Sequence, residues 1–281
     1  MNKNLAIYVS SCDKYSWLWP GFFYFFRKYW PDCRYNVYLG TETITTQEKG
    51  IIALTSGKRG IWGEITPLNL GQIKEDYILW LQEDYFLTRV VKTEEIEKSL
   101  EELILSKGKY LRLYIDPDLQ KRGIKKEDKG RRVSKISNDY FSTCSLQSAI
   151  WERGFLLSII DKSETPWEFE ANSLKKSLPS GAFYSINKSL VNYGFGGAMQ
   201  RGKLLRKYIK FFLQKDLRFN DENIMSIYED FRWHILNNPV GPIPGFFRSG
   251  LYTFFLRKIK NKENLRAIFK GVLKRFRYFS D

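Results

Sequence analysis

The stretch Tyr77–Leu87, YILWLQEDYFL, predicts a buried strand that ends abruptly in charge. Its first five residues, Tyr77–Leu81, form a continuous apolar run, as expected of a strand covered on both faces in an α/β protein. Gln82 follows, and then the adjacent carboxylates Glu83 and Asp84. Two acids at the carboxyl end of a buried strand either solvate the turn that leads onward or hold a charged ligand at the edge of the sheet.

Outward from this strand, other apolar runs of strand length alternate with segments of helical pattern. Strands are expected at Leu5–Ser10, Tyr35–Leu39, Tyr110–Ile115, Phe141–Leu146 and Phe183–Ile186, with a further one at Leu190–Tyr193. Helices are expected at Phe22–Trp30, Leu68–Asp76, Thr93–Ser106, Ala149–Ile160 and Glu222–Leu236. This alternation predicts an α/β fold with a mostly parallel central sheet flanked by helices.

The chain length and composition suit one large domain or a domain with an appendage. The 281 residues are 43% hydrophobic, which is ample for a core. A proline-rich segment at 237–246 begins a basic and aromatic extension, 237–281, which follows a predicted main domain, 1–236. The three cysteines are scattered without a metal-binding spacing, and the amino-terminal run lacks the pattern of a signal peptide. We therefore expect a cytoplasmic protein in a reducing compartment.

The net charge of +15 predicts an acidic partner: nucleic acid, an anionic membrane or a phosphorylated substrate. The extension mixes Phe, Leu and Ile with Lys and Arg. This composition favours the surface of an anionic membrane, although a basic helix packed on the domain has the same pattern. The single histidine, His234, is expected to pack within a helix.

Polar residues follow two of the predicted strands at the edge where ligands of open α/β sheets bind. One group is Ser10–Asp13 and the other is Glu83 with Asp84. Neither a G-x-G-x-x-G pattern nor a P-loop follows the first strand, which argues against a dinucleotide-binding dehydrogenase or a P-loop enzyme. Carboxylates at a strand end suit a Mg²⁺ or Mn²⁺ ion that bridges to a diphosphate.

A third acidic group is the stretch ETPWEFE, Glu164–Glu170. On an extended segment, Glu168 and Glu170 would share one face, and Trp167 and Phe169 the other. A carboxylate partly desolvated by rings has a raised pKa and can serve as a general base. A surface loop anchored by its aromatic residues is the alternative interpretation.

Three segments, taken in order, resemble a GT-A-type nucleotide-sugar glycosyltransferase of bacterial capsule, O-antigen or lipopolysaccharide synthesis. They are IYVSSCDKY, YILWLQEDYFL and SLQSAIWERGFLLSIIDKSETPWEFE, and the resemblance covers roughly residues 5 to 200. In such an enzyme they correspond to the nucleotide-binding turn, the D-x-D metal motif and the acceptor side with the catalytic base. Here the metal motif departs from the family pattern: Asp84 matches its last acid, but Gln82 stands in place of the first.

The resemblance implies a set of site residues. Glu168 or Glu170 would be the catalytic base, with Glu168 slightly preferred because it directly follows Trp167. The nucleotide sugar would contact Ser10, Asp13, Arg59, Trp62, Glu83 and Asp84, and the last two would hold the metal ion. The acceptor would contact Gln147, Trp151 and Trp167. Without the resemblance, Trp62 belongs to a loop and Trp151 to the core.

The sequence thus predicts an enzyme that moves a sugar from a nucleotide-sugar donor to a hydroxyl of a glycolipid or oligosaccharide acceptor. We expect it to lie peripherally on the inner face of the cell membrane. A basic nucleic-acid-binding protein is one alternative, but acids at the strand ends would repel phosphate. A metal-dependent nuclease or phosphodiesterase would need more converging acids or histidines. A non-catalytic membrane scaffold would leave the acidic residues without a role.

Overall fold

The computed structural model describes residues 4–115, 132–136, 143–176, 178–193, 197–217, 221–227, 229 and 230. Residues Met1–Met225 form one compact unit of the chain. The predicted extension 237–281, His234 and the second half of the helix expected at Glu222–Leu236 lie outside the described residues. So does the start of the strand expected at Phe141–Leu146.

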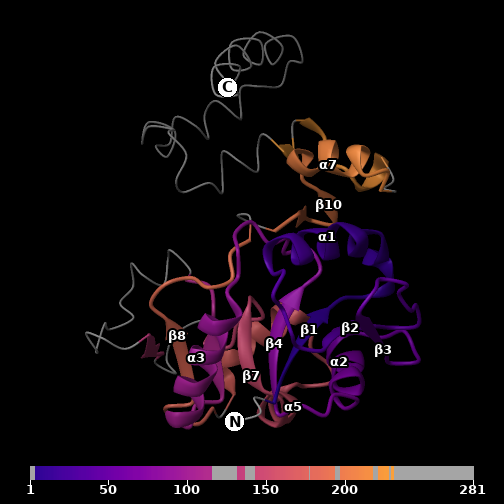
Figure 1. Ribbon diagram of the computed structural model, residues 1–281. Coiled ribbons are helices and arrows are strands. Elements are labelled where there is room, and N and C mark those ends of the chain that lie inside the picture. Colours follow the sequence, from indigo (N-terminus) through magenta and orange to yellow (C-terminus); the bar gives the residue numbers. More distant parts are fainter. Residues whose placement is uncertain are drawn as a thin grey trace, which may run out of the picture. The chain divides into compact units, whose positions relative to one another are not determined.

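An eight-stranded sheet forms the centre of this unit (Figure 1). Its strands are β1 (Leu5–Ser10), β2 (Val37–Thr41), β3 (Ile51–Thr55), β4 (Tyr77–Gln82), β5 (Tyr110–Arg112), β6 (Val133–Lys135), β7 (Ala149–Glu152) and β8 (Phe183–Ile186). Their spatial order is β3-β2-β1-β4-β7-β5-β8-β6. The pairs β3–β2, β2–β1, β1–β4 and β5–β8 are parallel. The pairs β4–β7, β7–β5 and β8–β6 are antiparallel. The predicted mostly parallel α/β sheet is therefore confirmed.

Helices supply the hydrophobic layers that cover this sheet. They are α1 (Trp19–Tyr29), α2 (Trp62–Leu70), α3 (Thr93–Leu105), α5 (Arg153–Ile159) and α6 (Pro166–Ala171). One apolar cluster joins α2, α5 and α6 to the sheet face that carries Trp80 and Trp151. The alternate residues Leu79 and Leu81 of β4 point to the opposite face and are also fully buried. On that side α1 and α3 are tied together, because Trp30 Nε1 donates to Thr93 Oγ1 at 2.8 Å.

Large aromatic rings fill much of the core, as the 16% aromatic content suggests. Tyr8 and Trp80 lie with ring centroids 5.0 Å apart, and Tyr110 and Trp151 lie 4.4 Å apart. The Tyr8 ring sits over β2 at Gly40, where an added Cβ would lie 2.1 Å from the phenol oxygen. A ring this close to the backbone leaves no room for any side chain at residue 40.

Substituting Gly40 by Ala is therefore expected to destabilise the fold by about 1–3 kcal/mol, because the Tyr8 ring must move within a packed core. Chemical denaturation measures the change. Gly154→Ala is the matched control: an added Cβ there meets nothing within 4 Å, and alanine favours the helix that contains this residue. A Gly40→Ala variant as stable as the wild-type protein would contradict the close approach of the Tyr8 ring to β2.

Several predicted elements differ from the structure, and neither Leu190–Tyr193 nor the described part of Phe141–Leu146 forms one of its strands. Residues Ala149–Glu152, expected to begin a helix, form β7, and α5 begins only at Arg153. The segment AIWE enters the sheet because β4 and β5 pair with it on both sides, a long-range effect that local helical pattern does not report. The helix expected at Leu68–Asp76 instead runs over Trp62–Leu70, earlier in the chain.

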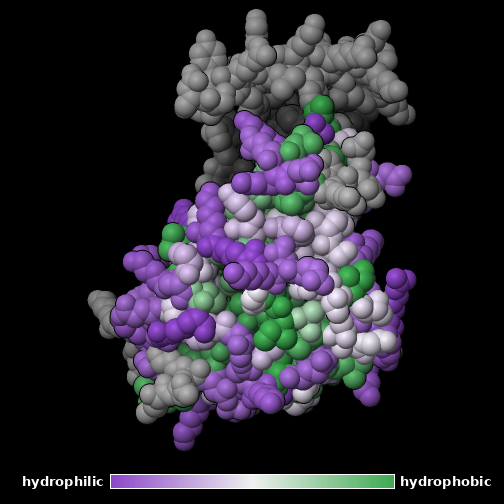
Figure 2. Space-filling view, turned by 45° about the vertical axis from the view of Figure 1, so that its right-hand side comes forward, coloured by the Kyte–Doolittle hydropathy of each residue, from purple (hydrophilic) through white to green (hydrophobic). Residues whose placement is uncertain are grey.

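The surface is dominated by hydrophilic residues, with a smaller hydrophobic area in the lower half of the face in Figure 2. In the part of the chain that the structure describes, none of the helices has the length and apolarity needed to cross a bilayer. A short two-stranded ribbon, β9 (Met199–Gln200) and β10 (Lys203–Leu204), stands apart from the main sheet. Gly197 and Ala198, directly before β9, lie against Asp84.

Candidate active site at the carboxyl edge of the sheet

The strand order reverses between β1 and β4. From β1 the chain runs to β2 and β3 on one side, and then crosses to β4 on the other side of β1. Loops that leave such neighbouring strands diverge, and the crevice between them is where open α/β sheets bind ligands. Ser10 and Gln82, the last residues of the two strands, are in register. The polar groups that follow them therefore start side by side, as the sequence predicted.

Glu83 and Asp84 form a tight turn beyond β4. The Glu83 amide donates to Ser10 O at 3.4 Å, and the Tyr85 amide donates to Gln82 O at 3.0 Å. From the other side, the Ala198 amide donates to Asp84 O at 2.6 Å. Gly197 has a φ of +70°, and an added Cβ there would lie 3.1 Å from a carboxylate oxygen of Asp84. The segment before β9 thus fixes the acidic turn, a contact across more than a hundred residues of chain.

The two carboxylates make this turn electrostatically unfavourable. Burial, together with the adjacent Asp84, raises the pKa of Glu83 well above its usual value. Burial raises the pKa of Asp84 to about 7. Both side chains remain partly exposed. A cation or a group of hydrogen-bond donors placed at this edge would relieve the cost of holding them together. Within the described residues, no group of three or more His, Cys, Asp or Glu is arranged to hold a metal ion.

Asp13, predicted to contact a nucleotide, instead binds the loop that follows β2. Its carboxylate accepts hydrogen bonds from the amides of Glu42, Thr43 and Ile44 at 3.0–3.2 Å, and from the Thr43 hydroxyl at 2.6 Å. In return, the Glu42 carboxylate accepts from the amides of Asp13 and Gly60. Burial acts to raise the pKa of Asp13, but these hydrogen bonds lower it overall. Asp13 therefore has a structural role at this edge.

Asp13→Asn is expected to cost about 1–2 kcal/mol of stability at pH 7, because charge-assisted hydrogen bonds become neutral ones. The folded state lowers the pKa of Asp13, so its contribution is present above the pKa of the unfolded chain and is lost as the pH falls. The difference between variant and wild type should close below about pH 4. Denaturant titrations at several pH values measure it, and a gap independent of pH would contradict this assignment.

The other residues predicted to contact the nucleotide sugar lie in different environments. Ser10 is partly exposed at the strand end, and Arg59 is exposed in the loop that Glu42 holds through Gly60. Trp62 is the first residue of α2, after the loop that leaves β3. It packs against Trp80 and Phe169, at centroid distances of 6.1 and 5.2 Å. Trp62 is only partly buried, and its contact with a nucleotide stays a prediction.

Sequence reasoning missed Tyr15, which lies in the turn after β1. Burial raises the pKa of its phenol, and the nearby charges of Glu83 and Asp84 add to the effect. The same turn carries Cys12, whose thiol pKa is raised to about 11 by burial, then by Glu83 and Glu42. No local pattern distinguishes Tyr15 from the other aromatic residues of this segment.

The stretch ETPWEFE is helical, and this corrects the expected arrangement of its acids. Residues Pro166–Ala171 form α6, in which Glu168 and Glu170 lie about 200° apart around the axis. Glu168 completes a capping box: its carboxylate accepts from the Thr165 amide at 2.8 Å. It is exposed, and these hydrogen bonds lower its pKa. Glu168, the catalytic base preferred from the sequence, thus caps a helix at the protein surface.

Glu170 points the other way, towards the carboxyl edge of the sheet. Its Oε1 accepts from the Leu146 amide at 2.6 Å and from Ser145 Oγ at 3.0 Å. Gln82 Nε2 donates to the carbonyl oxygen of the same Leu146 at 3.2 Å, which links Glu170 to the end of β4. Burial raises the pKa of Glu170 despite these hydrogen bonds and the charge of Arg112.

The electrostatic influence of Glu170 also extends to Tyr85. Burial, then Asp84, then Glu170 raise the pKa of that phenol. The structure therefore brings Glu170 and the acidic turn to one place, although 86 positions separate Asp84 from Glu170 in the chain.

A buried ion pair holds α6 in this orientation. Lys176 lies 2.6 Å from Glu164 at the start of the motif, and the two side chains are 15% and 8% exposed. The same ammonium donates to Ile159 O at 2.7 Å and sits over the Phe169 ring, 4.4 Å from its centroid. Such a pair contributes more to geometry than to net stability, since both charges are desolvated.

The three residues predicted on the acceptor side occupy different environments. Trp151 is fully buried in β7 and packs on Tyr110, so its predicted place on an acceptor surface is not met. Trp167 is 77% exposed. Gln147 lies in the loop before β7, and its side-chain oxygen is buried without a hydrogen-bond partner among the described residues. An unpartnered amide oxygen near Glu170 is a ready acceptor for a ligand hydroxyl.

A stack of tyrosines adjoins the acidic turn. The Tyr85 and Tyr193 rings lie 4.2 Å apart and within 5° of parallel, and Tyr114 stacks on Tyr193 at 4.6 Å. These residues come from three distant segments, and sequence analysis did not single them out. Together the observations define an α/β protein with a carboxylate pair at its topological switch point and a further carboxylate on a neighbouring helix.

Comparison with known proteins gives only distant likenesses. No protein-family model and no curated protein matches the chain. Two solved structures that match are both of S. aureus TarS, at 11% sequence identity. The match to TarS 1–349 has a TM-score of 0.38 and covers 65% of this chain and 60% of that one. The match to a longer TarS chain has a TM-score of 0.40 and covers 66% of this chain and 36% of that one. Likeness at this level assigns neither a family nor an activity.

Proposed function

We propose that the protein is a glycosyltransferase that moves a sugar from a nucleotide-sugar donor to a hydroxyl of an acceptor. The observation that carries the proposal is the acidic turn at the β1–β4 switch point, with Glu83 and Asp84 held together at raised pKa. A site that keeps two repelling carboxylates at the ligand-binding edge gains stability when a cation or donor groups bind there. Glu170 supplies the separate base that transfer to a hydroxyl requires.

On the donor side, Asp84 and Glu83 would hold a Mg²⁺ or Mn²⁺ ion together with the diphosphate. Mg²⁺ is commonly bound through one or two carboxylates plus substrate phosphates, so two acids suffice. When bound, the ion would stabilise the negative charge of the departing diphosphate. Arg59, exposed on the loop braced by Glu42 and Asp13, is proposed to contact the same phosphates. Ser10 would contact the nucleotide.

On the acceptor side, Glu170 is proposed as the general base in preference to Glu168. Both hydrogen bonds to its carboxylate end on Oε1, so Oε2 would take the proton of the acceptor hydroxyl. The acceptor oxygen forms a bond to the anomeric carbon while the bond from the sugar to the diphosphate breaks. The raised pKa of Glu170 suits a base that works near neutral pH. Gln147 and the exposed Trp167 would contact the acceptor.

The acceptor is proposed to be a glycolipid or oligosaccharide of a surface polysaccharide, reached at the inner face of the cell membrane. The net charge of +15 supports an anionic membrane surface as a partner. Nucleic acid is not favoured as the ligand of the acidic edge, since Glu83, Asp84 and Glu170 would repel its phosphates.

A thermal-shift screen of the full chain tests the donor. UDP-, GDP-, CMP- and dTDP-sugars would each be added with Mn²⁺, Mg²⁺ or EDTA. A ligand that binds only the folded state at about a hundred times its Kd adds about 2.7 kcal/mol, which raises Tm by several degrees. One nucleotide class should raise Tm, and Asp84→Asn should lose the rise. If none of the nucleotide classes raises Tm, the proposal is refuted. If the rise in Tm persists in EDTA, the metal ion is not part of the site.

A further inference from the structure

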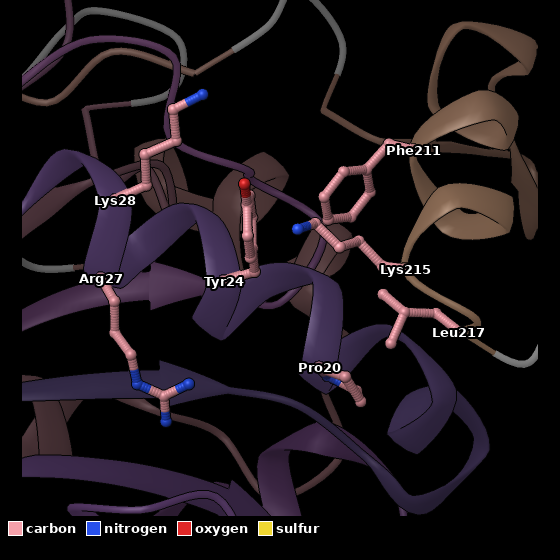
Figure 3. Close-up of a pocket in the computed structure, with 7 residues that line it drawn as sticks. All are labelled: Pro20, Tyr24, Arg27, Lys28, Phe211, Lys215 and Leu217. Atoms are coloured by element: carbon pink, nitrogen blue, oxygen red, sulfur yellow. The ribbon is translucent and has the colours of Figure 1, made fainter.

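A groove lies between α1 and α7 (Ile209–Gln214), and Figure 3 shows the residues that line it. Its volume is about 480 Å³. The residues that line it are Pro20, Tyr24, Arg27, Lys28, Phe211, Lys215 and Leu217. Three of these are basic, two are aromatic and none is acidic. The groove therefore offers positive charge beside apolar and aromatic surface.

Close packing of aromatic side chains builds the walls of the groove. The Phe211 ring of α7 lies 4.5 Å from that of Phe25 and 4.9 Å from that of Tyr24 in α1. At Gly21, an added Cβ would lie 2.9 Å from the Phe212 ring, so the helix surfaces meet without a gap. The hollow is thus a feature of packed helices within one compact unit.

The positive charge of the groove comes from its lysines rather than its arginine. Arg27 pairs with Glu48 at 2.8 Å and donates to Lys49 O, and in Figure 3 it points away from Lys28. Within the described part of the chain, neither Lys28 nor Lys215 has an ion-pair partner. The Lys215 ammonium lies over the Tyr24 ring, 4.8 Å from its centroid, and it points towards that ring in Figure 3. The Lys28 ammonium lies over the Tyr29 ring, 5.1 Å from its centroid. Two ammonium groups that form no ion pair among the described residues, and the Tyr24 hydroxyl, are thus available as donors.

We propose that this groove binds the phosphate headgroup of an anionic phospholipid at a bilayer surface. Ammonium groups and a phenol suit phosphate oxygens, while Pro20 and Leu217 suit the glycerol and upper acyl carbons. Aromatic residues favour this interfacial depth. Leu213, on α7, is 65% exposed and would enter the same layer. The inference rests on the proposed function for its membrane setting, but lipid binding is measured without donor or acceptor.

The groove is connected to the acidic turn through Phe86, two residues after Asp84. The Phe86 ring lies 5.3 Å from Phe25 of α1, 5.1 Å from Tyr208 and 6.3 Å from Phe212 of α7. The helices that form the groove are therefore built on a residue that closely follows the acidic turn. A headgroup in the groove would keep the carboxyl edge of the sheet close to the bilayer, where an acceptor attached to lipid is found.

Vesicle sedimentation with the full chain tests the proposal. Vesicles of phosphatidylcholine alone would be compared with vesicles that also contain phosphatidylglycerol. Lys28→Gln/Lys215→Gln is expected to weaken binding to the anionic vesicles roughly 30-fold, because each lysine at an anionic surface contributes about a fivefold factor. The matched control is Lys74→Gln/Lys162→Gln, which removes the same charge from exposed positions outside the groove. The control should bind within about twofold of the wild-type protein, and both variants should keep its Tm.

Each other outcome would overturn the site. Unchanged binding by Lys28→Gln/Lys215→Gln would place membrane contact elsewhere in the chain. Equal losses of vesicle binding in both double variants would show that net charge, and not the groove, determines the binding. Binding of inorganic phosphate without binding to vesicles would identify a site for free phosphate. Tight binding of single-stranded DNA, lost only in the groove variant, would identify a nucleic-acid site. A thermal shift with a nucleotide sugar but no vesicle binding would leave the transferase proposal standing and remove the membrane site alone.

Discussion

Asp84→Asn is expected to stabilise the protein at pH 8 and to abolish its binding of a nucleotide diphosphate. In the folded state burial raises the pKa of Asp84 from 3.8 to about 7, so the folded protein binds a proton that the unfolded chain releases. A group of this kind makes stability fall as pH rises between the two values. Above about pH 7 the charged Asp84 costs stability in full, and asparagine removes that cost. The neighbouring Glu83 also loses a repelling charge.

A rise in pKa from 3.8 to about 7 corresponds to at most about 4 kcal/mol. Because the side chain is partly exposed, screening by water reduces the expected gain to about 1–2 kcal/mol, or a few degrees in Tm. At pH 4 variant and wild type should be nearly equal. Transfer activity should fall about 10²- to 10³-fold, since a group that stabilises the charge of the leaving diphosphate is lost.

Thermal denaturation of both proteins from pH 4 to pH 9, with and without the donor found by screening, measures these effects together. Asp216→Asn is the control, because it removes an exposed carboxylate that lies far from the acidic turn in sequence. An Asp84→Asn variant that is less stable at pH 8, yet binds the donor normally, would show that the acidic turn is structural.

Glu170→Gln is expected to lower turnover by about 10²- to 10⁴-fold while leaving the fold and donor binding unchanged. The amide oxygen of glutamine can accept the same hydrogen bonds from Leu146 and Ser145, so the side chain keeps its place. It cannot take a proton from the acceptor hydroxyl. The donor-induced shift in Tm should therefore persist although transfer is lost, and the pH dependence of the residual rate should lose its acidic limb.

Glu168→Gln provides the matched comparison, because both residues belong to α6. Its exposed carboxylate only completes the capping box, so stability should fall slightly and turnover should stay near that of the wild type. The reverse result, a large loss in Glu168→Gln and none in Glu170→Gln, would restore the first assignment made from the sequence.

The sequence predicted the fold class because apolar runs and turn signals are local. The strands at Leu5–Ser10 and Phe183–Ile186 match the structure to the residue, and β4 is one residue longer than predicted. The prediction failed where distant partners decide the conformation. Ala149–Glu152 has a helical neighbourhood but lies between β4 and β5, and pairing on both sides makes it a strand.

For the site, the sequence by itself determined where the acids stand along the chain. It placed Glu83 and Asp84 at a strand end, because a buried strand must finish where charge begins. It slightly preferred Glu168 to Glu170, although the choice depends on whether ETPWEFE is extended or helical and on which face meets Leu146. It also assigned Asp13 and Trp151 to ligand contacts, because an aspartate that binds amides or a fully buried tryptophan has no local signature.

Only the tertiary structure decided which acids face one another. The switch point beside β1, the contact of Gly197 with Asp84 and the ion pair that orients α6 all join segments far apart in sequence. Burial is a property of these long-range contacts. The raised pKa of Asp84 and that of Glu170 therefore exist in the folded protein alone, and with them the chemistry proposed for this edge of the sheet.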